Sequence, residues 1–411
     1  SGGRTARRPH PGEPPDRPGP FQHTASREKA IVEEGQLFDL GPRHREIQQL
    51  ARSVAERVEE FADEADAAVE VHEGVAEVLR DSGLARQVVP AAYGGESDVL
   101  DPLAIAVVRE ALMYTSAHLD SLFGMQGVGS YSLTVGGTEE LKREWLPRVA
   151  RLEAIAGLAL TEPDIGSDLR GVTTTIQATA AGVRVDGRKS FITNGGAADF
   201  YCVLGREGEG YSMVLVPADA PGLTVRRGDD LIAPHILGEL HFDGVEVPEN
   251  HRLGVPGKAF SLMLQTLAVF RVTVAGSAVG LAQAALDEAL RHARNRKQFG
   301  RPLLELGAVS QSLALSWSEV ETARAITYRA AALAKSDPLG HLDYSSIAKV
   351  SATEAAGRVV DRSVQTMGRF GLVRGSKIER LYRNARPLRI YEGATEVLLD
   401  SLARRLAKQR G

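Results

Sequence analysis

Between Lys258 and Asp287 the chain contains 28 consecutive residues with a single charged side chain, Arg271. Apolar residues occupy both faces of the helix that this segment predicts, so the helix must be enclosed by protein rather than lie on a surface. Gln265 and Gln283 spread further polarity along the segment, which argues against a membrane span. An enclosed helix of this length is typical of a helical bundle.

Arg271 needs an explanation, because an unpaired guanidinium is too costly to bury. It must therefore meet a carboxylate, a cluster of carbonyl groups or an anionic ligand. An ion pair inside the bundle would be a purely structural explanation, whereas an anionic ligand would make Arg271 a binding residue. The segment alone leaves both explanations open.

The whole chain has the composition of an ordinary globular protein. Its 411 residues carry 49 Lys and Arg against 53 Asp and Glu, a net charge of −4 that gives no reason to expect a nucleic-acid partner. The single cysteine, Cys202, cannot form an internal disulfide and favours a reducing, cytoplasmic location. Residues 1–36 are rich in Pro and Gly without apolar periodicity, which predicts a disordered leader, and we expect no secretory signal there.

Hydrophobic periodicity divides the remaining chain into three parts. Residues 37–156 are mostly helical in pattern, residues 157–258 alternate in short segments, and residues 259–411 return to helical spacing. Asp186-Gly187 lies between two alternating runs and predicts a hairpin turn. The expected fold is α+β and multidomain, with an N-terminal helical domain, a middle antiparallel β-barrel or sandwich, and a C-terminal helical bundle.

Several common catalytic motifs are missing from the sequence. It has no Rossmann G-x-G-x-x-G turn, no P-loop and no G-x-S-x-G elbow, and its ten histidines show no metal-ligand spacing. We therefore expect neither a nucleotide held by a glycine turn nor a catalytic metal.

Two segments of the β region carry residues suited to binding. LALTEPDIGSD, residues 158–168, offers hydroxyls and backbone amides, and KSFITNGG places Phe191 and Thr193 on one face of a strand. An aromatic ring beside a hydroxyl suits a flat heterocycle. A capped turn and a core phenylalanine are the plainer explanations of the same residues.

Two segments nearer the C-terminus carry charge. RNRKQFG, residues 294–300, ends the long helix with basic residues, which either complement the helix dipole or bind an anion. RIYEGATE holds Glu392 between Tyr391 and Gly393. Desolvation would raise the pKa of Glu392 and make it a competent base near neutral pH, whereas a solvated loop glutamate would have no such role.

Together these segments resemble the acyl-CoA dehydrogenase superfamily of flavoenzymes, over residues from about 40 to 411. The markers occur in the family's order: GLARQVVPAAYGG, GTEELKREWLP, LTEPDIGSD, KSFITNGG, AVGLAQAALDEALRHARNRKQFGRPL, QTMGRFG and YRNARPLRIYEGATE. The resemblance implies an N-terminal helical domain, a middle β-barrel and a C-terminal four-helix bundle. It also implies a homotetramer or dimer with FAD in each subunit.

The resemblance assigns expected roles to individual residues. Glu392 corresponds to the base that removes the α-proton, and Arg271 to an arginine that binds the thioester. Tyr391 and Gly393, on either side of Glu392, are expected to contact the substrate as well. The positions that line the flavin ring correspond to Leu158, Leu160, Thr161, Phe191 and Thr193, and Ser167 to a contact with the pantetheine phosphate. The residues that hold the FAD of a neighbouring subunit correspond to Arg296 and Phe299, together with Gln365 and Gly368 on the adenosine side of that FAD. Thr395 and Glu396 lie in the segment that approaches FAD after the catalytic glutamate.

The implied reaction is α,β-dehydrogenation of an acyl thioester to the trans-2-enoyl thioester. Glu392 would take the α-proton while a hydride passes from the β-carbon to flavin N5, with the Glu392 backbone N–H and an FAD ribityl hydroxyl polarising the thioester oxygen. The expected electron acceptor is an electron-transfer flavoprotein. An oxidase that reduces O₂, or a flavin-binding scaffold without catalysis, are the alternatives, and the presence of Glu392 argues against the scaffold.

Some positions depart from the family's pattern. Phe270 occupies the site where some members place the base, which leaves Glu392 as the base and should narrow the acyl pocket to a short or compact acyl group. Ala268 stands where an aspartate is usual on the thioester side, so an acyl carrier protein remains an alternative carrier to CoA. Arg369 replaces a glycine in the adenosine-side segment, so the backbone there should approach the cofactor differently.

Overall fold

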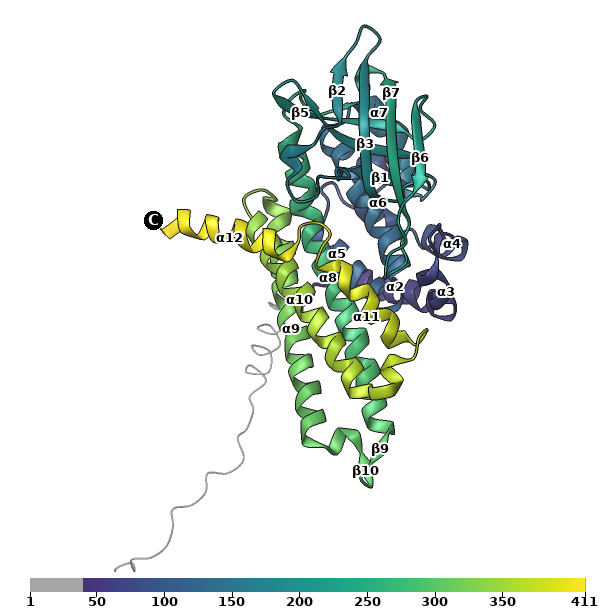
Figure 1. Cartoon of the computed structure of the whole chain (residues 1–411), viewed down its shortest axis with the longest axis vertical. Helices are drawn as coiled ribbons and strands as arrows, with labels where there is room; N and C mark the ends of the chain where they lie inside the picture. The colour runs from purple at the N-terminus through teal and green to yellow at the C-terminus, as the bar shows by residue number, and fades with distance from the viewer. Residues whose placement is uncertain (1–39, 411) are drawn as a thin grey trace, which may run out of the picture. The chain divides into compact units, whose positions relative to one another are not determined.

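The computed structural model describes residues 40–410, and the predicted leader, residues 1–36, lies outside them. After residue 40 the chain forms helices up to Ala150, then a sheet, then helices again to Arg410. This is the predicted order of an N-terminal helical domain, a middle β domain and a C-terminal helical domain. In Figure 1 the strands of the sheet gather at one end, and the long C-terminal helices run side by side away from it.

The N-terminal region is built from helices with polar caps and apolar interiors. Asp101 accepts hydrogen bonds from the backbone N–H groups of Leu103 and Ala104, and Pro102 occupies the first turn, where its missing N–H costs nothing. Ser116 caps the next helix in the same way. The helices are α2 (Pro42–Val58), α3 (Ala62–Ala67), α4 (Glu73–Ser82), α5 (Pro102–Thr115), α6 (Ala117–Gly136) and α7 (Glu139–Ala150).

The middle region forms one eight-stranded sheet, in which the strands follow the order β6-β7-β3-β2-β4-β5-β8. Most neighbours are antiparallel as predicted, but β1 pairs with β4 in parallel, and so does β2 over a single residue pair. The antiparallel pairing expected from the sequence is therefore wrong at these two pairs and holds for the others. The strands are β1 (Ala156–Ala159), β2 (Thr175–Ala178), β3 (Val183–Thr193), β4 (Phe200–Glu207), β5 (Gly210–Pro217), β6 (Leu223–Arg227), β7 (Leu237–Val247) and β8 (Arg252–Leu253).

The hairpin turn predicted at Asp186-Gly187 is also wrong. Both residues lie inside the continuous strand β3, where the register against β7 shifts between Val185 and Gly187. Gly187 has a φ of 144°, and a side chain there would collide with Thr174. The Asp-Gly pair thus marks a β-bulge instead of a turn, a use of glycine that the local sequence does not separate from a hairpin.

The C-terminal region is a helical bundle centred on α8. This helix packs against α9 and α10, and also against α5 of the N-terminal region. Its apolar length would suffice to cross a membrane, but 83% of its most apolar 18-residue window is buried inside the protein, as in the core helix of a bundle. The elements are α8 (Ala259–Asn295), β9 (Lys297–Gln298), β10 (Arg301–Pro302), α9 (Gly307–Ser336), α10 (Leu342–Met367), α11 (Lys377–Leu388) and α12 (Thr395–Arg410).

Candidate active site

Glu392 lies in the short loop that joins α11 to α12. Its backbone is left-handed, with a φ of 52°, and Gly393 follows with a φ of 107°. A left-handed conformation is costly for a residue with a side chain, so surrounding contacts must hold it. Such backbone strain concentrates at functional sites, which makes this loop the first place to look for chemistry.

The carboxyl group of Glu392 is placed as a base requires. The side chain is half-buried, and its Oε2 atom is buried without a hydrogen-bond partner among residues 40–410. Burial raises the pKa of Glu392, while the positive charges of Arg109, Arg271 and Lys349 oppose that rise. The carboxyl therefore has an unused acceptor atom and cations nearby that favour its ionised form.

Arg271 meets this loop from α8. Its side chain is buried, Nε donates to the Glu392 carbonyl oxygen at 2.9 Å, and Nη1 donates to Ser346 Oγ at 3.2 Å. In the part of the chain that the structure describes, Arg271 lies within ion-pair distance of no carboxylate. The structural ion pair considered from the sequence is thus not formed, and the partner is a backbone carbonyl of the loop formed by residues 389–394.

The residues predicted to line the flavin come together at one region of the sheet. Leu158 lies in β1, Leu160 and Thr161 follow that strand, and Phe191 and Thr193 end β3. The backbone N–H of Ser190 donates to the Thr161 carbonyl oxygen at 3.0 Å, which joins the two segments. Phe191 is 55% exposed and has a left-handed φ of 54°, so its ring is held at the surface instead of entering the core.

A buried ion pair stabilises this flavin-lining region. Lys189 Nζ donates to the Leu160 carbonyl oxygen at 2.8 Å and lies 3.0 Å from Glu162 Oε1. Glu162 also accepts hydrogen bonds from Thr173 and Thr174. Despite burial, these donors and the ammonium of Lys189 lower the pKa of Glu162 to about 2.

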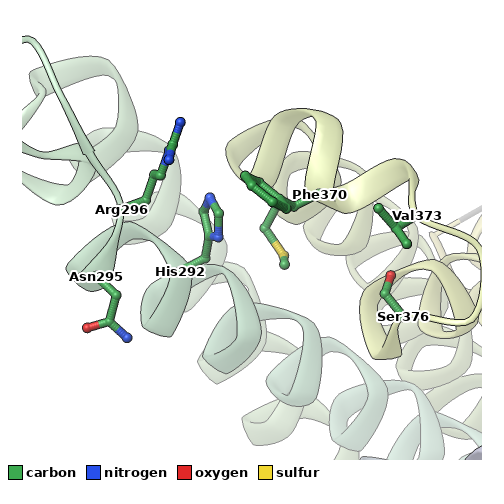
Figure 2. A pocket seen from close by; sticks show the side chains of 7 residues that line it. His292, Asn295, Arg296, Phe370, Val373 and Ser376 are labelled. Atoms are coloured by element: carbon green, nitrogen blue, oxygen red, sulfur yellow. The ribbon is translucent and has the colours of Figure 1, made fainter.

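A pocket lies at the C-terminal end of α8, and Arg296 is the one residue predicted to hold FAD that lines it within the described part of the chain. The pocket has a volume of about 510 Å³. Figure 2 shows His292 of α8, and Arg296 just after that helix, on the side of the pocket opposite Phe370, which follows α10. The guanidinium of Arg296 lies 5.7 Å from the Phe370 ring centre and that of Arg369 lies 4.9 Å from it. The lining residues are His292, Asn295, Arg296, Met367, Phe370, Val373 and Ser376.

The other residues predicted to hold FAD near the C-terminal end of α8 differ in backbone conformation and in exposure. Gln365 lies in the last turn of α10, and Gly368 follows that helix with a φ of 58°. Phe299 lies between β9 and β10, is 90% exposed and has a left-handed φ of 52°. A fully exposed aromatic side chain in a strained conformation has no partner within the described part of this chain.

The pocket and the loop that holds Glu392 are separate sites within one chain. Arg271 lies in α8 and Arg296 caps its C-terminal end, 25 positions later, which at 1.5 Å per residue places them about 38 Å apart along the helix axis. The structure therefore brings Arg296 together with Phe370, and Arg271 together with Glu392, but it does not join the two groups.

The remaining residues predicted for the site differ in their exposure and contacts. Ser167 and Glu396 are exposed, and Tyr391, next to Glu392 in the chain, is 40% exposed. Thr395 is buried, and its hydroxyl donates to Glu354 Oε1 at 2.8 Å. Phe270 is fully buried and packs edge-on against Tyr131, with its ring centre 5.6 Å away. The ring of Phe270 thus lies in the core, and its expected effect on the acyl pocket stays a prediction.

Sequence reasoning missed three residues that the structure places at these sites. Lys349 and Arg109 both face Glu392, and Phe370 forms one wall of the pocket. Lys349 lies among serines, a threonine and Glu354 in the sequence of α10, so it does not stand out there as Arg271 does in α8. Its place beside Glu392 follows from how α10 packs against the loop.

The chain is similar to known proteins over all three of its regions. Residues 41–153, 157–245 and 257–407 match the N-terminal, middle and C-terminal domains of the acyl-CoA dehydrogenase family. The chain is 32% identical to the cyclohexane-1-carbonyl-CoA dehydrogenase of Geobacter metallireducens, covering 91% of this chain and 100% of that protein. It is 33% identical to the mitochondrial short-chain specific acyl-CoA dehydrogenase of Bos taurus, covering 88% of this chain and 89% of that protein.

Solved structures show the same fold. The butyryl-CoA dehydrogenase from Megasphaera elsdenii superposes with a TM-score of 0.85 at 30% identity, over 90% of this chain and 99% of that one. A glutaryl-coenzyme A dehydrogenase in complex with glutaryl-CoA gives a TM-score of 0.86 at 28% identity, over 91% and 97%. The chain therefore belongs to the acyl-CoA dehydrogenase family, whose members are FAD-dependent oxidoreductases that dehydrogenate acyl-CoA.

Proposed function

We propose that Glu392 is the base of this dehydrogenase and that it removes the α-proton of a short or compact acyl-CoA. The observation that carries this proposal is the unpartnered, buried Oε2 atom of Glu392 on a loop held in a left-handed conformation. A carboxyl with a raised pKa binds the abstracted proton more strongly than a solvated one, which suits removal of a proton from carbon.

The residues present fit FAD. An exposed Phe191 beside Thr193 offers a flat apolar face with a hydroxyl, and Arg296 with Phe370 offers charge and an aromatic ring for a nucleotide. When bound, FAD supplies the acceptor for the hydride that leaves the β-carbon. The protein's part is to hold the thioester so that the α-proton faces Glu392 and to exclude water from the carboxyl.

The distance between the two groups of residues supports a shared cofactor site. Because Arg296 lies about 38 Å along α8 from Arg271, one FAD molecule cannot contact both ends within one chain. We propose a homo-oligomer in which Arg296, Phe299, Gln365 and Gly368 of one subunit hold the FAD of its partner. The exposed ring of Phe299 supports this arrangement, and light scattering of the purified protein tests it.

The relatives support a compact acyl group. Their names specify cyclohexane-1-carbonyl-CoA, cyclohex-1-ene-1-carbonyl-CoA, short-chain acyl-CoA and butyryl-CoA as substrates of those proteins. An acyl carrier protein as carrier stays an alternative, because Ala268 takes the place of an aspartate on the thioester side.

We also propose an electron-transfer flavoprotein as the electron acceptor. Stoichiometric formation of hydrogen peroxide would favour an oxidase instead. A cytoplasmic location is proposed from the single buried Cys202, and cell fractionation tests it.

The decisive test is anaerobic bleaching of the bound flavin by substrate in Glu392→Gln. Loss of the base should slow bleaching by roughly 10²- to 10⁴-fold while FAD stays bound. Glu77→Gln on the surface of α4 is the matched control and should bleach as the wild type does. Butyryl-CoA, cyclohexanecarbonyl-CoA, palmitoyl-CoA and butyryl-acyl carrier protein form the substrate panel. Undiminished bleaching in Glu392→Gln would show that another residue is the base.

A further inference from the structure

Two buried cations hold the backbone of the base loop, which is formed by residues 389–394. Arg271 from α8 donates to the carbonyl oxygen of Glu392 at 2.9 Å, and Lys349 from α10 donates to the carbonyl oxygen of Gly393 at 2.6 Å. Lys349 is fully buried. Within residues 40–410 neither cation lies within ion-pair distance of a carboxylate, so each contacts this loop through a carbonyl oxygen, while the charge of Glu392 acts on both from a greater distance.

Such an arrangement is expensive, because a buried ammonium without a carboxylate partner loses much of its hydration energy. Burial accordingly lowers the pKa of Lys349 to about 8. A purely structural contact to a carbonyl would be made at less cost by a neutral donor such as serine or glutamine. The use of a lysine here therefore suggests that its charge has a role.

The loop needs external support, because two successive residues, Glu392 and Gly393, are left-handed. Its two ends are tied together by Glu354, which accepts hydrogen bonds from Arg389 Nε, just after α11, and from Thr395 Oγ1, at the start of α12, both at 2.8 Å. With Arg271 and Lys349 on consecutive carbonyl groups, the loop is held from both sides. The direction of the Glu392 side chain is thereby set by groups that lie outside the loop.

We propose that Lys349 is a positioning residue for the base: its ammonium fixes the Gly393 carbonyl, orients the Glu392 carboxyl and, with Arg271, stabilises that carboxyl in its ionised form. This inference rests on the proposed role of Glu392 and adds a residue that acts through it. Lys349 itself touches neither substrate nor flavin in this scheme.

The electrostatic surroundings of Glu392 come from several elements. Arg109 faces it from α5, Asp120 from α6, Arg271 from α8, Lys349 from α10 and Tyr391 from its own loop. Glu354, Glu396 and Arg271 are the other charged groups that act on Lys349. Three of these neighbours of Glu392 are cations, and their charges lower its pKa while burial raises it. Removal of one cation weakens the lowering. The pKa of Glu392 then rises, and a smaller fraction of the enzyme carries the ionised base at a given pH.

The experiment compares the pH dependence of flavin bleaching in Lys349→Met with that of the wild-type holoenzyme, using butyryl-CoA under anaerobic conditions. Lys349→Met keeps the length and apolar stem of the side chain but removes its charge and its hydrogen bond. We expect the rate at neutral pH to fall roughly tenfold and the midpoint of the acid limb to move up by about one pH unit. The KM for butyryl-CoA should change little.

Three companion variants separate the possible causes. Lys349→Gln retains a donor without the charge, so its acid limb should shift like that of Lys349→Met while its rate falls less. Lys335→Met is the matched control, because Lys335 is a bundle lysine whose ammonium pairs with Asp101 at 2.7 Å. It should leave both the rate and the limb unchanged. Glu392→Gln in the same assay tests the base itself.

The outcomes are distinct. An unmoved acid limb in both Lys349 variants would overturn the proposal, even if the rate falls, because a loss of structure alone does not shift a titration. If Lys349→Met does not fold, the acid limb of the pH profile of Lys349→Gln decides the question in the same way. Full bleaching in Glu392→Gln would instead overturn the proposed function, whatever the Lys349 variants show.

Discussion

At the scale of single residues, buried charges distinguish the sites of this protein from its surface. Lys189 and Glu162 form an ion pair whose side chains are 0% and 3% exposed, under the segment predicted to line the flavin. On the same strand β3, Arg184 and Asp186 form a pair whose side chains are 45% and 36% exposed. Removing one partner of a buried pair leaves an uncompensated charge, whereas removing one partner of an exposed pair leaves a hydrated one.

We therefore expect Lys189→Met to destabilise the protein by about 3–5 kcal/mol and to weaken FAD retention, because the Leu160 carbonyl also loses its donor. Arg184→Met, the matched exposed variant, should cost less than about 1 kcal/mol. Urea denaturation followed by circular dichroism measures both, and gel filtration followed by the flavin absorbance measures retention. Equal costs for the two variants would mean that the buried pair adds nothing beyond a surface pair.

Residue by residue, the sequence predicted which side chains matter better than it predicted their partners. Glu392 and Arg271 were singled out from the sequence, and the structure joins them through a backbone carbonyl instead of an ion pair. That contact depends on the left-handed turn at Glu392, which no local pattern of residues specifies. The role of Lys349 likewise depends on how α10 packs beside the loop, so it becomes visible only in three dimensions.

At the scale of elements, the position of α8 against α5 decides how closely the N-terminal region approaches the bundle. Gly276 and Gly280 face the carbonyl oxygens of Ala106 and Glu110 so closely that a Cβ at either position would overlap them. The helical pattern predicted that α8 is enclosed. It did not predict which neighbour requires glycine, because α5 lies more than 140 residues earlier in the chain.

Gly280→Ala should force α5 and α8 apart and destabilise the protein by about 1–3 kcal/mol. Gly357→Ala is the matched control, because Gly357 lies within α10 and the nearest atom to its added methyl group would be Arg389 Cδ at 3.7 Å. With room for the methyl group, that substitution should stabilise the helix by up to about 1 kcal/mol. Thermal unfolding of both variants checks the signs, and a neutral or stabilising Gly280→Ala would show that the two helices can separate without cost.

At the scale of the whole molecule, the order of the three regions follows from hydrophobic periodicity. The contacts between segments that are distant in the sequence do not. Alternating and helical periods place the sheet between two helical regions, as observed. The parallel pairing of β1 with β4 and the bulge at Gly187 reflect pairing partners distant in the sequence, which a local pattern cannot specify. The predicted sharing of FAD between subunits depends on the length of α8, a property of the assembled bundle.

The response of the molecule to acid follows from two histidines, the buried His118 of α6 and the half-buried His235, which precedes β7. Burial, together with the nearby His235 and His72, lowers the pKa of His118 to about 4, and burial lowers that of His235 to about 4 as well, against an ordinary value of 6.5. Between pH 6.5 and about 4 the unfolded chain therefore binds protons that the native protein does not. Stability should fall as the pH decreases through this range and should be independent of these two groups above it.

His118→Gln removes one of these protons and keeps an acceptor for the backbone N–H of His72, which now donates to His118 Nε2 at 3.1 Å. Because one proton changes the free energy of unfolding by about 1.4 kcal/mol per pH unit, the variant should lose on the order of 1–2 kcal/mol less than the wild type between pH 7 and pH 5. Urea denaturation at the two pH values gives this difference directly. Carboxylates with lowered pKa values, such as Glu162, act below this range and equally in both proteins, so they cancel. Parallel losses of stability in the variant and the wild type would mean that His118 is protonated in the native protein as readily as in the unfolded chain.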